Sequence, residues 1–179
     1  MPLTNPALSS HVEPTEIHLG PFAIRWDGTA LTVTHDAEPR RRLWSTAPQQ
    51  GFIRAAHGKA DVHESRGLFT VKDGPVRWTQ SQSLDTIEER ADGVLLSGRL
   101  GGELEGQWSW VWSLAHDNEL LFELAVQEKD GAPGFDRVIL TGAREPDEAF
   151  FGFGEQLTHL NLAGKRVPIL SQEPGIGRG

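Results

Sequence analysis

The stretch that decides the fold covers residues 107–127 and reads QWSWVWSLAHDNELLFELAVQ. Its first half carries Trp108, Trp110 and Trp112 at every second position, and an apolar residue occupies every second position in its second half. Alternation with a period of two places these side chains on one face of a strand. The pair Asp117-Asn118 between the halves suits a tight turn. The stretch therefore predicts an antiparallel hairpin whose two apolar stripes meet on one face.

Similar turn pairs divide the rest of the first 145 residues into short alternating segments. These pairs tolerate the positive φ of a tight turn, so each predicts a reversal of the chain. They are Asp27-Gly28, Asp73-Gly74, Asp92-Gly93 and Asp130-Gly131. Further strands are expected at 17–26, 29–35, 67–72, 75–80, 84–91, 93–100 and 136–142. Because no segment before residue 145 shows a capped helical period, the predicted fold class is all-β, an antiparallel β-sandwich.

The amino-acid composition changes near both ends of the sequence. Residues 1–15 hold three Pro with Ser, Thr and Asn, which predicts a flexible leader before a sandwich at 16–145. Residues 146–179 begin with a charged connector and finish in a Gly-rich stretch directly after Pro174. This ending is typical of an irregular arm that stops within a loop. We therefore expect the chain to be the front piece of a longer protein.

Composition excludes several classes of function. The 179 residues carry 17 Lys and Arg against 25 Asp and Glu, a formal charge of −8. This balance argues against a nucleic-acid surface, and the single basic run, 40–42, is expected to be the solvated face of a strand. No segment is apolar enough for a membrane helix or a signal peptide, so a cytoplasmic protein without a membrane partner is expected. With no Cys, disulfides and thiolate chemistry are excluded.

The Trp ladder at 108–112 allows two interpretations. Flat indole rings could form a platform for sugars. However, period-two Trp residues facing a second apolar strand are typical of a sandwich core, and the core interpretation is favoured.

The residues show no active site of their own. His57 and His63 flank a predicted turn without a third ligand at metal-binding spacing, so neither a metal site nor a cofactor is predicted. The glycines near residue 101 lack the Lys and helix of a P-loop, and a Gly-x-Ser-x-Gly elbow is absent. No catalytic residue is predicted.

The segment 150–179 is more specific, and it reads FFGFGEQLTHLNLAGKRVPILSQEPGIGRG. It resembles the junction between the N-terminal β-sandwich and the catalytic barrel of glycoside hydrolase family 31, the α-glucosidase and α-xylosidase family. The opening aromatic-Gly-x-Gly-Glu is the part shared broadly, whereas the remainder, ending in Gln-Glu-x-Gly-Ile-Gly-Arg, is most similar to the sulfoquinovosidase branch. Phe151 departs from the pattern, because the family often has Tyr there. The resemblance implies a galactose mutarotase-like supersandwich.

The family resemblance also implies where the chemistry lies. Retaining glycoside hydrolysis uses two carboxyl groups about 5 Å apart, which in this family are Asp residues of the (β/α)8 barrel. Both would lie beyond residue 179, so this chain alone is expected to be inactive and to meet its α-glycoside through a barrel. Its own substrate-binding candidates are Glu155, Gln156, Gln172, Glu173 and Arg178. For Glu155, sugar contact and a structural ion pair at the domain joint are equally open, while for the last three the structural alternative is favoured.

Two functions from different classes therefore remain. The chain is either the accessory sandwich of a family 31 α-glycosidase or a stand-alone carbohydrate-binding or mutarotase-like sandwich. The first alternative predicts an exposed apolar joint around Phe150, Phe151 and Phe153. Homo-oligomerisation of an intact enzyme stays open.

Overall fold

A computed structural model of the chain describes residues 5–37, 41–65, 68–116, 119–151 and 161–164. These residues form twelve strands, which confirms the all-β fold class. None of the described segments is a helix of the length and apolarity needed to cross a membrane. The strands are β1 (Ala7–Ser10), β2 (Thr15–Leu19), β3 (Phe22–Trp26), β4 (Leu31–His35), β5 (Arg41–Ser45), β6 (Ile53–Ser65), β7 (Leu68–Leu84), β8 (Thr86–Arg90), β9 (Gly93–Gly102), β10 (Gly106–His116), β11 (Glu119–Glu128) and β12 (Arg137–Leu140).

The chain divides into two compact units. The first comprises residues 1–62 and 71–143, and the second comprises residues 63–70 and 144–179. The first unit carries the core described below, and the second carries the segment that bears the family motif.

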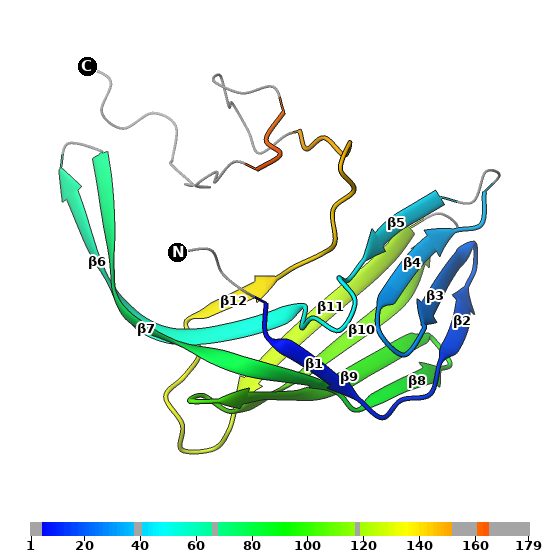
Figure 1. The fold of residues 1–179 in the computed structure, drawn as a ribbon, viewed down its shortest axis with the longest axis horizontal. Helices are drawn as coiled ribbons and strands as arrows, with labels where there is room; N and C mark the ends of the chain where they lie inside the picture. The colour runs from blue at the N-terminus through cyan, green and yellow to red at the C-terminus, as the bar shows by residue number, and fades with distance from the viewer. Residues whose placement is uncertain (1–4, 38–40, 66–67, 117–118, 152–160, 165–179) are drawn as a thin grey trace. The chain divides into compact units, whose positions relative to one another are not determined.

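The strands belong to two sheets (Figure 1). The larger sheet has the order β11-β10-β9-β7-β6-β12, with β1 added to β7 and β8 added to β9. The smaller sheet is an antiparallel meander, β2-β3-β4-β5. The pairing between β1 and β7 is parallel, which the antiparallel prediction did not include.

The hairpin predicted from residues 107–127 is confirmed. β10 and β11 pair so that Trp108 lies opposite Val126, Trp110 opposite Leu124 and Trp112 opposite Phe122. The predicted turn residues 117–118 lie outside the described residues. The register nonetheless brings the two apolar stripes to the same face, as alternation with period two requires.

The core lies between the two sheets of the first unit. Ile24, Trp26, Leu31 and Val33 of the smaller sheet belong to one buried cluster with the Trp ladder of the larger sheet. Each of the three ladder residues is only 2% exposed. The interpretation of the ladder as core is therefore confirmed, and these indoles are not a platform for sugars.

Three of the predicted strands, 17–26, 67–72 and 75–80, are bounded differently in the structure. The segment 17–26 is divided by a turn at Gly20, whose φ of +56° is readily adopted by glycine. The predicted turn at Asp73-Gly74 is wrong, because β7 continues through it. The reason is packing: a Cβ atom on Gly74 would come within 2.9 Å of the Lys59 carbonyl oxygen on β6, so this glycine serves close strand approach.

Two segments without predicted strands belong to the larger sheet. β1 lies within the expected leader and pairs with residues 81–84 of β7. β6 contains His57 and His63, which were expected to flank a turn and instead lie within a strand. The strand β6 was not predicted because its sequence shows no alternation of apolar and polar residues. Its residues beyond Ala56 are partly or fully exposed, so the strand needs no such alternation there.

Candidate functional site

The five substrate-binding candidates of the sequence all lie outside the described residues. Glu155 and Gln156 fall in the segment 152–160, and Gln172, Glu173 and Arg178 fall in 165–179. Their roles stay predictions. The described residues on either side of 152–160 still show how the chain enters and leaves this segment.

The chain on both sides of residues 152–160 is tied together by hydrogen bonds. The backbone N–H of Leu162 donates to the Phe150 carbonyl at 2.8 Å, and the Phe150 N–H donates to the Asn161 side-chain oxygen at 3.1 Å. The same oxygen accepts a bond from the Ala163 N–H at 2.9 Å. Asn161 thus fixes two backbone groups at once, and these bonds hold Phe150 next to residues 161–163.

The aromatic pair that opens the motif is exposed. Phe150 is 39% and Phe151 63% exposed. Exposure was expected at three phenylalanines. It is confirmed for these two, while Phe153 lies outside the described residues and the domain joint itself stays a prediction. Large exposed apolar side chains next to each other are typical of a surface that another body covers.

A second apolar surface lies at the edge of the larger sheet. β11 ends the strand order, and its Phe122 is 60% exposed although it packs at 5.6 Å, ring centre to ring centre, from the buried Trp110. Trp44 of β5 reaches the same rings, at 5.3 Å from Trp110 and 6.2 Å from Trp112. The aromatic core therefore continues to the protein surface at this edge.

A polar groove of about 860 Å³ crosses the larger sheet in the first unit. Its lining comes from the ends of β1, β7, β9, β10 and β11. Its polar lining includes the side chains of Arg99, Gln107, Gln127, Ser9, Ser81 and Ser83. No aromatic side chain is among the described residues that line it.

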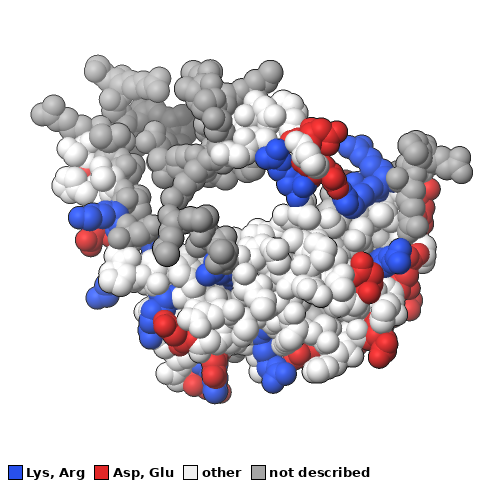
Figure 2. Space-filling view, in the orientation of Figure 1, with Lys and Arg blue, Asp and Glu red and all other residues white. Residues whose placement is uncertain are grey.

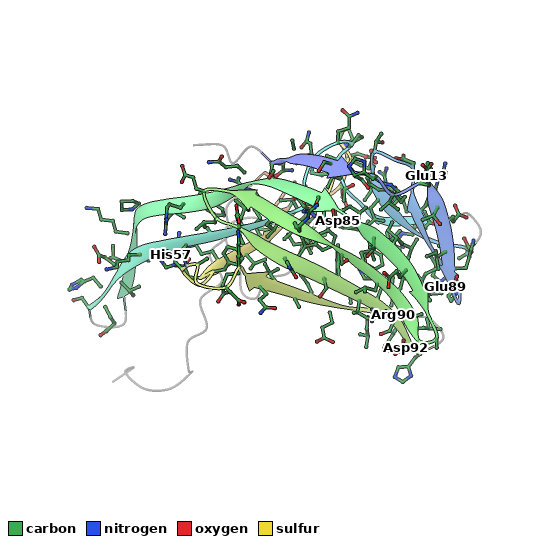
Figure 3. The ribbon with its side chains drawn as sticks, turned by 90° about the horizontal axis from the view of Figure 1, so that it is seen from below. Glu13, His57, Asp85, Glu89, Arg90 and Asp92 are labelled. Carbon is green, nitrogen blue, oxygen red and sulfur yellow. The ribbon has the colours of Figure 1, made fainter. Side chains whose placement is uncertain are left out.

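Both cations that line this groove form ion pairs. Arg99 donates from Nε to the Asp85 carboxylate at 2.9 Å, and Lys129 donates to the Glu105 carboxylate. The hydrogen bond and the charge of Lys129 lower the pKa of Glu105, and the same partner raises the pKa of Lys129. Asp85 lies where β7 passes into β8 (Figure 3). Each cation therefore already has a carboxylate partner, and an anionic ligand would have to compete with it.

The histidines form no metal-binding group in the part of the chain that the structure describes. His57 Nδ1 lies 2.7 Å from the Gly134 carbonyl oxygen and 3.7 Å from the Asp136 carboxylate, so it anchors a loop. Glu13 and Glu89 lie far from it along the molecule (Figure 3). Across the described segments, no group of three His, Cys, Asp or Glu residues is arranged to hold a metal ion.

Charges on the visible face are mixed. Figure 2 shows acidic and basic side chains interspersed along the rim instead of a continuous basic patch.

Comparison with known proteins identifies the fold. A family model described as the glycosyl hydrolase 31 N-terminal galactose mutarotase-like domain matches residues 7–175. The chain belongs to this family. The glycosyl hydrolase 31 N-terminal domain thus accounts for both the two-sheet core and the motif segment.

Two curated relatives resemble this glycosyl hydrolase 31 N-terminal domain. One is the sulfoquinovosidase of Escherichia coli (strain K12), 28% identical over 123 residues, which cover 68% of the chain and 17% of that protein. The other is the sulfoquinovosidase of Agrobacterium fabrum (strain C58 / ATCC 33970), 28% identical over 138 residues, 77% of the chain and 19% of that protein. The chain therefore spans less than a fifth of the length of these relatives. No solved structure matched it.

The polar groove was missed by the sequence analysis. Its main residues, Gln107, Gln127 and Arg99, alternate with the core residues of their own strands. The signal was the polar half of each period-two pattern, which does not show by itself which strands lie side by side. Only the register between strands shows that these polar residues form one row.

Proposed function

We propose that the chain is the N-terminal accessory domain of a retaining α-glycosidase that hydrolyses α-sulfoquinovosides. The observation that carries the proposal is the family match over nearly the whole chain, joined by two relatives that are both sulfoquinovosidases. Because the chain spans less than a fifth of those relatives, the catalytic carboxylates belong to another part of the parent protein. The domain alone is inactive in this proposal.

The task of the domain is to pack against a catalytic barrel and to lend a loop to the sugar pocket. The exposed Phe150 and Phe151 supply apolar area for the packing. The hydrogen bonds of Asn161 to Phe150 and Ala163 give the loop defined ends. A loop held in this way contributes orientation, which lowers the barrier by placing the sugar and not by chemistry of its own.

The predicted pocket residues fit this role chemically. Glu155 and Gln156 would accept hydrogen bonds from sugar hydroxyls, and Gln156 would also donate. Gln172 and Glu173 would act similarly, and Arg178 would meet either the anionic head of a sulfoquinovoside or an acidic residue of the barrel. The proposal places the parent enzyme in the cytoplasm and assigns it no cofactor.

The deciding experiment assays the full-length parent on an aryl α-sulfoquinovoside and, in parallel, on the matching aryl α-glucoside. We expect kcat/KM to favour the sulfonated substrate by at least about a hundredfold, since a site built to pair a charged group rejects the analogue that lacks it. A preference for the glucoside would leave the family assignment intact and overturn the branch. No hydrolysis of either would overturn the proposed activity.

A stand-alone mutarotase-like function finds less support. Such chemistry needs a general acid and a general base that face one sugar site. Among the described histidines, the His57 ring already interacts with the Gly134 carbonyl oxygen and the Asp136 carboxylate. His18 lies between Glu16 and Asp36 on the surface of the smaller sheet, at 3.2 and 3.4 Å. Neither lines the polar groove.

A further inference from the structure

The polar groove of the first unit is built from one row of side chains that crosses five strands. Gln107 of β10 lies opposite Gln127 of β11 and opposite Arg99 of β9. The row continues to Ser83 of β7, whose hydroxyl accepts a hydrogen bond from the Arg99 N–H at 3.0 Å, and to Ser9 of β1. Four spacings between neighbouring strands span roughly 19 Å, which is longer than a single pyranose ring.

This row faces away from the core. Gln107, Gln127 and Arg99 are exposed, while their neighbours Trp108, Val126 and Leu100 belong to the core or pack on it. The groove is therefore formed on the outer surface of the sheet and is open to a ligand from solvent.

Small residues form the depression at one end of the row. Ser9, Ser81, Ser83 and Gly101 line it, and Gly101 lies opposite Ser81. A Cβ atom on Gly101 would lie 2.8 Å from the Ser81 hydroxyl oxygen. Larger side chains at these positions would fill the space, so the groove exists because this end of the row is small.

The free hydrogen-bonding groups of the groove are amides and hydroxyls. Among the described residues, the structure records no side-chain hydrogen bond for Gln107, Gln127, Ser9 or Ser81. Each amide offers two donors and an acceptor, and each hydroxyl donates and accepts. This combination matches the adjacent hydroxyls of a sugar, which also both donate and accept.

The charged side chains that line the groove favour a neutral ligand over an anionic one. The described lining contains the cations Arg99 and Lys129 and three carboxylates, those of Glu105, Glu128 and Asp130. Both cations are already paired, Arg99 with Asp85 and Lys129 with Glu105. An anion would meet unpaired acidic groups, and an apolar peptide would find no aromatic anchor in the described lining.

We propose that this groove is a binding site for a neutral oligosaccharide, separate from the pocket to which the motif segment contributes. The ligand lies along the row from Gln127 to Ser9, with its hydroxyls bonded to the two Gln amides and to the Ser hydroxyls. Since no aromatic ring is available for stacking, affinity rests on hydrogen bonds, and a dissociation constant in the millimolar range is expected. The site does not depend on the substrate proposed for the parent enzyme.

The test titrates the 15N-labelled 179-residue chain with maltotriose, with cellotriose and with sulfoquinovose. We expect saturable shifts for at least one neutral trisaccharide, confined to backbone amides of the groove lining, which are those of residues 9, 81–83, 99–101, 105–107 and 127–130. Sulfoquinovose should bind there at least about fivefold more weakly because of the carboxylates. The absence of saturable shifts with both trisaccharides at tens of millimolar overturns the site, as do shifts confined to the aromatic edge at Trp44 and Phe122.

Variants then test which side chains act. The double variant Gln107→Ala/Gln127→Ala should weaken binding by about tenfold, because two hydrogen-bonding amides are lost at exposed positions. Ser81→Leu, which fills the depression, should also weaken binding. Glu123→Ala is the matched control, because it lies on the same face of β11 outside the groove lining, and it should bind like the parent chain. Unchanged affinity in both groove variants overturns the proposal, whatever substrate the full-length parent hydrolyses.

Discussion

Gly98 lies directly opposite Trp108 in the pairing of β9 with β10, and its lack of a side chain leaves room for the indole. A Cβ atom on Gly98 would come within 2.8 Å of the indole Nε1 and within 1.9 Å of the Ser83 carbonyl oxygen. That indole N–H donates to the same carbonyl at 3.0 Å. One glycine therefore permits both the packing of the first ladder residue and its hydrogen bond across the sheet.

Gly98→Ala should destabilise the domain by about 3 kcal/mol, because the new methyl group meets backbone atoms that cannot move aside. Urea unfolding followed by Trp fluorescence measures the change. Gly134→Ala is the control, since a Cβ there has no neighbour closer than 3.7 Å. Equal stability of the two variants would contradict the role assigned to Gly98.

Trp110→Ala should cost about 3 to 5 kcal/mol of folding free energy, because the ring is 2% exposed and packs against Trp44, Trp112 and Phe122. Phe122→Ala is the matched comparison in the same cluster. It should cost less, since Phe122 is 60% exposed. A folded Trp110→Ala protein of unchanged stability that has lost glycan affinity would restore the platform interpretation of the ladder.

Asp27→Ala should weaken the β3–β4 turn by about 1 to 2 kcal/mol at neutral pH. The Asp27 carboxylate accepts hydrogen bonds from the Thr29 hydroxyl at 2.7 Å and from the Thr29 and Ala30 N–H groups at 2.8 Å. The hydrogen bond from Thr29 is the largest cause that lowers the pKa of Asp27.

The direction of the Asp27 pKa shift determines how this contribution to stability depends on pH. Because the pKa of Asp27 is lower in the folded state, the stabilisation is complete above the ordinary Asp value and is lost as the pH falls through the folded pKa. Urea unfolding at neutral pH and below about pH 4 should show the difference between Asp27→Ala and the parent chain shrinking in acid.

The exposed aromatic pair of the motif segment should cause the isolated chain to self-associate. Sedimentation velocity over a range of concentrations should show association that Phe150→Ser/Phe151→Ser reduces, because these side chains are 39% and 63% exposed. Val62→Ser is the control at another exposed apolar position, 61% exposed. A monomer at all concentrations would count against an apolar joint.

Glu155→Ala in the full-length parent should lower kcat/KM by more than about tenfold if the loop contributes to the sugar pocket. The variant should lose kcat/KM without losing stability. An unchanged melting temperature checks that the fold is intact. Activity within a few-fold of the parent, together with a lower melting temperature, would mean that Glu155 serves the domain joint instead.

Period-two patterns and turn chemistry were sufficient to predict the strands at the centre of the fold. β9, β10 and β11 and the turns at Asp27, Asp92 and Asp130 lie where the alternation and the Asp-Gly pairs place them. Local patterns failed where packing decides: Gly74 looks like a turn residue, yet it lies within a long strand against Lys59 of β6. The pairing of β1 with β7 was not predicted either, because a strand of four residues is too short to show an alternating pattern and the pattern would not identify its partner.

The amino-acid sequence alone determined that this protein is built from strands, that its Trp ladder is buried, and that its last thirty residues resemble a glycosidase family to which the chain belongs. These properties are local, since each depends on neighbouring residues along the chain. Only the tertiary structure decided that Gln127, Gln107, Arg99, Ser83 and Ser9 share one row. A cross-strand row depends on register, and register is set by the packing of the opposite, apolar face and not by the polar residues that form the row.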